Sequence, residues 1–178
     1  SVYLDQDNFE GIPLLNVIVP GSKAALEACG GKKIAVLGTS ATVRSHAYLK
    51  TIQEISPTTE VEEIACPLFV PLVEEGWYSA DDIVVVETVR RYLKPLIEAE
   101  VDTVILGCTH FPVLTDAIKK ILGDGVTLID AGTATSAAVL DYLTNKVDYL
   151  LIEDIYKNKF GESLFASENY FVNSYSKN

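Results

Sequence analysis

Short apolar runs alternate along the chain with segments whose apolar residues recur every three or four positions. The short runs predict five strands, at residues 14–19, 33–37, 61–65, 103–106 and 126–129. The segments with helical spacing predict helices at residues 22–29, 41–55, 80–99, 112–122 and 133–142. Strands that alternate with helices in this way predict an α/β fold, a doubly wound and mostly parallel sheet with helices on both faces.

Local signals refine several of these elements. Two glutamates interrupt the apolar pattern of residues 61–65, so we expect that strand to lie near an edge of the sheet. Ser79 is the expected N-cap of the long helix, with Asp81 and Asp82 in its first turn. The helix at 112–122 has a proline at its start and Gly123 at its end.

The carboxyl ends of the predicted strands are where a ligand is expected. Right-handed crossovers bring these ends to one edge of a parallel sheet, and ligands bind outside that edge. The turns at residues 38–42, 107–110 and 130–133 meet there, and each places small or hydroxylated residues before a helix start. Such turns are suited to holding an anion.

Composition excludes several classes of protein. The chain has 178 residues, of which 48% are apolar and 22% charged, so one ordinary domain, alone or with an appended piece, can bury a core. No apolar run approaches the roughly 20 residues that span a membrane, and no secretory signal opens the chain, so we expect a cytoplasmic protein. The net charge of −11 argues against a nucleic-acid partner.

The three cysteines and two histidines give little support to a disulfide framework or a metal site. Cys29, Cys66 and Cys108 are odd in number and widely spaced, and no C-x-x-C motif occurs. We predict no metal and interpret Cys66 as a core residue, Cys29 as a core or surface residue and His46 as a surface or packing residue.

Cys108 is the strongest candidate for chemistry, in the stretch VILGCTHFP at residues 104–112. A free cysteine is often only a small buried hydrophobe. This one, however, ends a buried strand directly before a helix start, which favours the thiolate form. Gly107 permits close backbone approach, and His110 lies two residues on as a proton partner or ligand. On these grounds a Cys-His hydrolase or transferase and a non-catalytic dicarboxylate- or protein-binding domain remain open readings.

Four stretches together resemble the glutamate racemases of the aspartate/glutamate racemase family. They are VIVPG at 17–21, GTSATVRSHAY at 38–48, CPLFVPLVEEGW at 66–77 and GCTHFP at 107–112. The third is the most specific. The resemblance runs from about residue 11 to 143, which we take as the racemase domain. We expect residues 144–178 to be a tail that packs on a missing first domain, with a hint of a family strand at 170–172.

The resemblance implies cofactor-independent conversion of L-glutamate to D-glutamate for peptidoglycan synthesis, by two cysteines on opposite faces of the substrate. Cys108 would be one acid/base, and Thr109 and His110 would contact glutamate. Glu74 would orient His110, with a plain solvated charge as the competing interpretation. Thr39 and Thr42 would bind the substrate carboxylate, although simple N-capping competes and is favoured for Thr42. We interpret Asp130 as structural.

Some of the family's features are not present in the sequence. The motifs of the first half, among them the Ala-Cys-Asn-Thr that carries the other cysteine, do not occur. Val19 stands where family members often have glutamate. We therefore expect this chain to be one half of a pseudo-symmetric two-domain racemase, with little activity alone. Its exposed face would favour self-association, for example as a homodimer.

Overall fold

The computed structural model describes residues 8–9, 12–31, 33–146, 157–158 and 161. The chain divides into two compact units, residues 1–138 and 139–178, and the sheet belongs to the first. Most of the expected tail at 144–178, including the strand hint at 170–172, lies outside the described residues.

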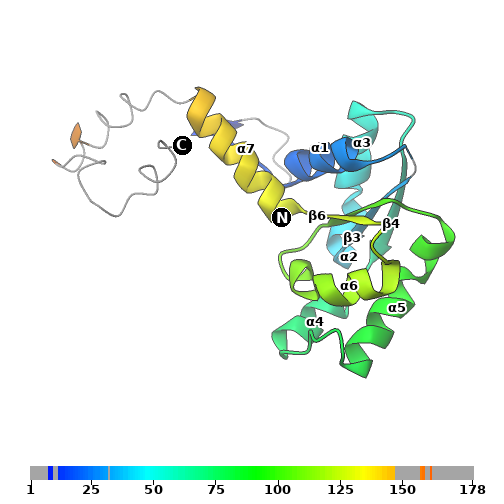
Figure 1. Ribbon diagram of the computed structural model, residues 1–178. Helices are drawn as coiled ribbons and strands as arrows, with labels where there is room; N and C mark the ends of the chain where they lie inside the picture. The colour runs from blue at the N-terminus through cyan, green and yellow to red at the C-terminus, as the bar shows by residue number, and fades with distance from the viewer. Residues whose placement is uncertain (1–7, 10–11, 32, 147–156, 159–160, 162–178) are drawn as a thin grey trace. The chain divides into compact units, whose positions relative to one another are not determined.

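The first unit is built on a parallel sheet of four strands (Figure 1). These are β3 (Lys33–Gly38), β4 (Glu60–Ala65), β5 (Thr103–Leu106) and β6 (Thr127–Asp130), in the order β4-β3-β5-β6. The α/β class and the parallel sheet predicted from the sequence are confirmed, and β4 lies at an edge. A separate antiparallel pair consists of β1 (Asn8–Phe9) and β2 (Ile12–Pro13).

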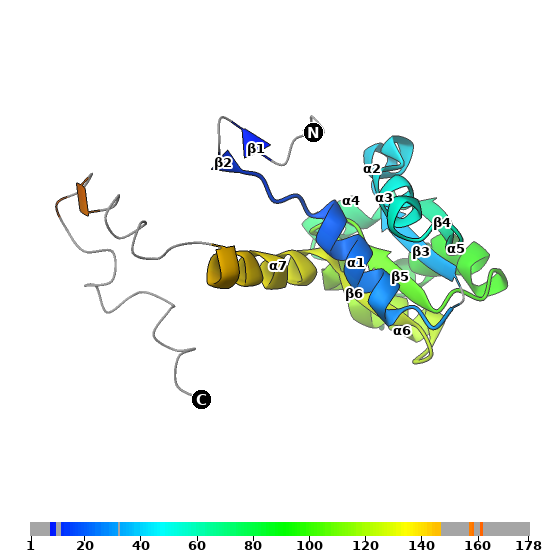
Figure 2. The same cartoon turned by 90° about the horizontal axis from the view of Figure 1, so that it is seen from above.

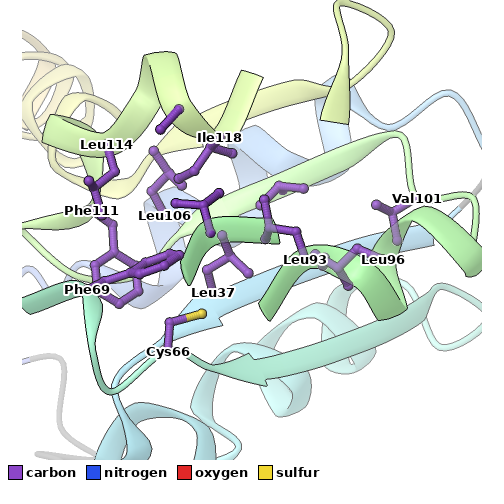
Figure 3. Close-up of a cluster of buried hydrophobic side chains, with 14 of the residues drawn as sticks. Leu37, Cys66, Phe69, Leu93, Leu96, Val101, Leu106, Phe111, Leu114 and Ile118 are labelled. Atoms are coloured by element: carbon purple, nitrogen blue, oxygen red, sulfur yellow. The ribbon is translucent and has the colours of Figure 1, made fainter. Parts of the chain in front are cut away.

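Helices cover both faces of the sheet. Successive residues of a strand point to opposite sides, so apolar side chains on each side need a layer of helices to bury them. Ala35 and Leu37 of β3 face a cluster formed with α4 (Phe69–Glu74), α5 (Ile83–Glu98), the 3₁₀ helix η1 (Phe111–Leu114) and α6 (Thr115–Leu122) (Figure 3). Ile34 and Val36 face a second cluster formed with α1 (Ile18–Ala28) and α3 (Ala47–Ile55). Figure 2 shows α1 lying against β5 and β6. The central strands β3 and β5 are therefore buried from both sides, as their continuous apolar sequences predict.

The strand predicted at residues 14–19 is wrong, because a helix begins inside it. The side-chain oxygen of Asn16 accepts hydrogen bonds from the backbone N–H groups of Ile18 and Val19, each at 2.9 Å. This cap satisfies two amides that have no partner within a helix. Pro20 falls in the first turn of α1, where a missing N–H has no effect on the helix. A local side-chain cap thus overrides the strand preference of a β-branched run.

The helix predicted at residues 41–55 is two helices, α2 (Ser40–Ser45) and α3. They are separated by His46, whose φ of 53° lies in the left-handed region. The periodic apolar positions continue across this break, so hydrophobic spacing alone could not reveal it.

The N-cap predicted at Ser79 is also wrong. Asp82 caps α5, because its carboxylate accepts from the N–H groups of Val84 at 2.7 Å and Val85 at 3.2 Å. Ser79 instead accepts from the N–H of Asp81 in the preceding turn. The carboxylate directly before the apolar run makes the cap, and the helix begins at Ile83.

The remaining helices differ from their predictions only at their ends. The helix predicted at 112–122 starts as η1, continues as α6 and ends at Gly123, whose φ is 82°. The helix predicted at 133–142 is α7 (Ala131–Lys146). Among the residues that the structure describes, no helix is long and apolar enough to cross a membrane.

Candidate active site

The turns that follow β3, β4 and β5 leave the sheet side by side. The N–H of Gly107 donates to the carbonyl of Leu37 at 2.8 Å, and the N–H of Cys66 donates to the carbonyl of Gly38 at 2.9 Å. The turn after β5 is packed without spare room. A Cβ on Gly107 would lie 2.9 Å from the Leu37 carbonyl oxygen and 3.1 Å from a ring carbon of Tyr48. Glycine is therefore required directly before Cys108.

Cys108 and His110 face each other across a single turn. The Cys108 sulfur lies 3.9 Å from Nδ1 of His110, and the thiol is half-buried. The turn is closed by hydrogen bonds from the N–H of Phe111 to the Cys108 carbonyl and from the N–H of Val113 to the His110 carbonyl. The predicted juxtaposition of thiol and imidazole is present, and the short 3₁₀ helix η1 holds it.

Glu74 reaches the same imidazole from the end of α4. Its Oε1 lies 3.5 Å from Nε2 of His110, on the side of the ring opposite the thiol. The Glu74 side chain is 62% exposed, so this contact contributes little to stability. A carboxylate at Nε2 favours the tautomer with the proton there, which leaves Nδ1 free to accept the thiol proton. The three side chains therefore form a row that can move a proton at the sulfur.

Thr39 and Thr42 place two hydroxyls together after β3. Their oxygen atoms lie 3.0 Å apart, and Thr39 also accepts from the N–H of Thr42 at 3.2 Å. Thr39 is thus the N-cap of α2, and the expectation that favoured Thr42 as the capping residue is wrong. Since the two hydroxyls share one hydrogen between them, one remains able to donate outward.

The cysteines and acids outside this row have structural surroundings. Cys66 is fully buried, and burial raises the pKa of its thiol to about 12, which confirms it as a core residue. Cys29 follows the last residue of α1 and is half-buried. Asp130 accepts from the N–H of Gly132 and from the Thr133 hydroxyl, so it caps the start of α7. Within the described part of the chain, no three His, Cys, Asp or Glu side chains gather as metal ligands.

The cluster around Cys108 is open toward solvent. Thr109 is exposed, and so is the apolar side chain of Val113 on η1. Two hollows of about 410 and 490 Å³ lie elsewhere, beside α6 and β6 and along α5, and neither is lined by Cys108. A ligand at Cys108 would therefore meet the described residues on one side.

Tyr48 was expected only as an apolar position of a helix, yet it shapes this site. Its ring is 1% exposed, and ring carbons lie close to both Gly21 and Gly107. The sequence carried no signal for this contact, because 59 positions (107 − 48) separate Tyr48 from Gly107. Two widely separated glycines next to one aromatic ring can be recognised only once the fold is known.

Known proteins resemble the part of the chain that contains Cys108, His110 and Glu74. The sequence model of the Asp/Glu/Hydantoin racemase family matches residues 7–139. The chain belongs to this family. Glutamate racemase of Geobacter metallireducens is 46% identical over 132 residues, covering 74% of this chain and 48% of that protein. Glutamate racemase of Lactiplantibacillus plantarum is 47% identical over 135 residues, covering 74% and 49%. The chain thus spans about half the length of the curated relatives it matches.

Solved structures of the family share the fold. A glutamate racemase isoform from Bacillus anthracis is 31% identical, with a TM-score of 0.69, covering 86% of this chain and 63% of that one. The glutamate racemase of Francisella tularensis, solved in complex with D-glutamate, is 27% identical with a TM-score of 0.69, covering 86% and 62%. The resemblance found in the sequence is therefore confirmed at the level of family and fold.

Proposed function

We propose that this chain supplies one side of the active site of a glutamate racemase, which interconverts L- and D-glutamate without a cofactor. The observation that carries the proposal is the row of Cys108, His110 and Glu74 at the carboxyl edge of the sheet. The names of the most similar relatives and the D-glutamate in the Francisella tularensis structure support glutamate as the substrate.

The row fits an acid–base role for Cys108. As a thiolate, Cys108 takes the α-proton of glutamate, and the electron pair of the broken C–H bond stays on the substrate. A thiol on the opposite face then gives a proton to the same carbon, which inverts it. His110, oriented by Glu74, holds the proton that Cys108 must lose before each turnover. Developing negative charge on the substrate is met by fixed donors, for which Thr39, Thr42 and Thr109 are the candidates.

The second thiol must come from outside this sequence. The three cysteines are all described, and Cys66 is buried with its proton held to a pKa of about 12. Cys29 lies before β3, and therefore at the amino-end edge of the sheet rather than the carboxyl-end edge. We propose that a first racemase domain supplies the second cysteine. The match to this chain covers only about half of each relative, which is consistent with this proposal.

The wider context follows from the same proposal. Residues 11–143 act as the racemase domain, and the product serves peptidoglycan synthesis in the cytoplasm. The exposed side chain of Val113, on the η1 helix that follows Cys108, suits a face that another chain or domain covers. Light scattering after size-exclusion chromatography would detect self-association of the isolated chain as a homodimer.

One observation favours a second candidate. A thiol, an imidazole and a carboxylate in a row are also the parts of a cysteine nucleophile with its base and orienting group. Such an enzyme would form an acyl intermediate on Cys108. Mass spectrometry after incubation with activated glutamyl esters distinguishes the two, since a racemase forms no such adduct in its cycle.

The decisive test replaces the matching half of the Geobacter metallireducens relative with this chain. We expect the chimera to exchange the α-proton of L- and D-glutamate in D₂O, and Cys108→Ala to lower the rate by about 10²–10⁴-fold. The 178-residue chain alone should exchange little or nothing. Cys66→Ala is the matched control and should retain exchange.

Two results would overturn the proposal. A folded chimera that binds D-glutamate without exchanging its α-proton would exclude racemisation. Full exchange in the Cys108→Ala chimera would remove Cys108 from the chemistry. The unmodified relative, handled in the same way, shows that the assay itself works.

A further inference from the structure

Glu63 is a carboxylate in an unusual place. It lies on β4, and its side chain is only 8% exposed. Val61, two residues earlier and so on the same face, packs against the apolar cluster beneath α1 and α3. Burying a charge on such a face is costly unless a partner compensates it. One oxygen, Oε1, has no hydrogen-bond partner among the described residues.

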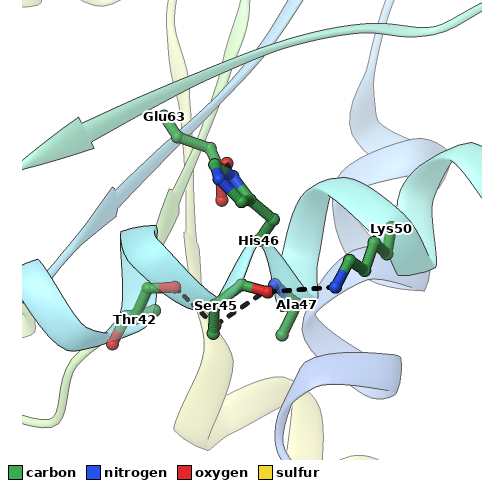
Figure 4. Close-up of polar contacts among 6 residues, drawn as sticks. All are labelled: Thr42, Ser45, His46, Ala47, Lys50 and Glu63. Carbon is green, nitrogen blue, oxygen red and sulfur yellow. Dashed lines mark hydrogen bonds and ion pairs between the residues drawn. The ribbon is translucent and has the colours of Figure 1, made fainter.

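The other oxygen of Glu63 has one partner, the imidazole of His46. Oε2 lies 2.5 Å from Nδ1 of His46, which reaches across from the junction of α2 and α3 (Figure 4). The side chain of His46 is 53% exposed. Its backbone φ of 53° lies in the left-handed region, at the break between α2 and α3. A non-glycine residue in this region costs roughly 1 kcal/mol or more, so surrounding contacts must hold it there. The contact between His46 and Glu63 is one of those contacts.

His46 joins two helices through its backbone. Its N–H donates to the carbonyl of Val43 and closes α2, and its carbonyl accepts from the N–H of Lys50 in α3. Since α3 packs on α1, this end of α2 is anchored to the body of the unit. The Glu63 contact adds a link to the sheet.

The opposite end of α2 carries the two threonine hydroxyls. The helix has six residues, less than two turns, so its two ends move together. The N–H of Val43 donates to the carbonyl of Thr39 at 3.0 Å, and the Ser45 hydroxyl donates to the carbonyl of Thr42 at 2.6 Å. Contacts that hold His46 therefore also hold the turn that presents Thr39 and Thr42.

We propose that Glu63 is a positioning residue that acts through His46 to fix α2 and the hydroxyl pair of Thr39 and Thr42. Its effect on substrate binding rests on the proposed function, because only then do these hydroxyls meet the glutamate carboxylate. Its effect on α2 does not depend on any activity, so the two claims can be tested separately.

Two substitutions separate positioning from simple stabilisation. His46→Gly removes the imidazole and relieves the backbone strain, since glycine adopts a positive φ freely. Glu63→Leu removes the buried carboxylate and leaves His46, whose side chain is 53% exposed, so no buried polar group loses its partner. Glu63→Leu should therefore leave the melting temperature unchanged or higher, whereas His46→Gly leaves the buried Glu63 carboxylate without that contact and should lower it. Glu62→Leu, next along β4 and exposed on the other face, is the matched control.

The first measurement is amide hydrogen exchange of the 178-residue chain by NMR. We expect exchange at Thr42 and Val43 to be at least about fivefold faster in His46→Gly and Glu63→Leu, and unchanged in Glu62→Leu. Glu63→Gln keeps an acceptor for the imidazole and should restore exchange to within about twofold of the natural chain. Natural exchange rates at both amides in both variants would overturn the proposal.

The second measurement uses the chimera and glutamate. We expect both variants to raise KM by about fivefold while kcat stays within about twofold, because ground-state positioning is lost and the thiol is untouched. Faster amide exchange with an unchanged KM would overturn the substrate part of the proposal. A chimera that is inactive with Glu63 and His46 intact would count against the proposed function instead, and amide exchange would still decide the role of Glu63.

Discussion

Cys66 and Cys108 follow the two strands that flank β3 in the same sheet, yet they have opposite surroundings. Cys66 comes directly after β4, and Cys108 comes two residues after the end of β5. Both pack toward the same apolar cluster. Cys66 is fully buried, with its sulfur 3.7 Å from the Ile64 carbonyl. Cys108 is half-buried, with an imidazole at 3.9 Å.

The difference shows that a strand end does not by itself make a reactive thiol. After Cys66 the chain turns into α4, and Phe69 at the start of that helix is fully buried. After Cys108 the turn brings back His110, and α4 presents Glu74 to that ring. The polar groups that follow each strand, rather than the strand itself, distinguish the candidate catalytic thiol of Cys108 from the buried thiol of Cys66.

Thiol alkylation should give the largest contrast between the two cysteines. With a pKa of about 12, Cys66 is about 10⁻⁴ ionised at pH 8, since the difference is four pH units. We expect iodoacetamide to modify Cys108 at least about 10³-fold faster than Cys66, measured by peptide mass mapping. Half-buried Cys29 serves as the reference thiol without a histidine partner. Equal rates at Cys66 and Cys108 would contradict the comparison.

Replacing the glycine before Cys108 should have the next largest effect. Gly107→Ala would place a methyl group 2.9 Å from the Leu37 carbonyl oxygen, and backbone cannot move aside cheaply. We expect a loss of about 2–3 kcal/mol in the free energy of unfolding, measured by urea denaturation. Gly125→Ala, where no atom lies within 4 Å of the added carbon, should change stability by less than about 0.5 kcal/mol. A tolerated Gly107→Ala would mean that the turn is looser than described.

The smallest effect concerns the structural thiol and depends on pH. Cys66→Ala should cost about 1–2 kcal/mol at pH 7 through lost packing, whereas Cys108→Ala should cost less than about 0.5 kcal/mol. Burial holds the proton of Cys66 in the folded state, while an unfolded thiol ionises near pH 8.5. The stabilisation from Cys66 is therefore complete below about pH 8.5 and is lost as the pH rises toward 12.

Urea unfolding at pH 7 and pH 10 tests this sign. At pH 10 the unfolded thiol is about 1.5 pH units above its pKa and is ionised, which stabilises the unfolded state. The difference in unfolding free energy between the natural chain and Cys66→Ala should therefore shrink by up to about 2 kcal/mol. The same comparison with Cys108→Ala shows how much of any change arises from other groups. A gap that widens with pH would show that Cys66 is not held in its neutral form.

The sheet could be predicted from sequence because its central strands, β3 and β5, are apolar on both faces and the segments between the strands have helical spacing. The errors arose where one polar side chain decides the local structure. Asn16 turns a β-branched run into a helix start, and Asp82 rather than Ser79 caps α5. A run such as Val-Ile-Val cannot by itself reveal which amides a nearby side chain will bind.

The candidate site could be predicted as far as its residues are close in sequence or carried by a family motif. Cys108 and His110 are two residues apart, and Glu74 entered only through the resemblance to glutamate racemases. Tyr48 against Gly107 and Glu63 against His46 could not be predicted, because each pair meets only through the packing of α2 and α3 on the sheet. Their roles follow from tertiary contacts that leave no local pattern.

The charges on β4 also bear on how the protein behaves at high concentration. β4 ends the described sheet, and an open strand edge offers backbone groups that can pair with another molecule. Glu60 and Glu62 are exposed along it, and Lys33 pairs with Glu60 at 2.8 Å. Two molecules meeting edge to edge would bring these carboxylates together, so repulsion protects the edge from the ordered aggregation to which apolar strands are prone. High salt would screen this repulsion and weaken the protection.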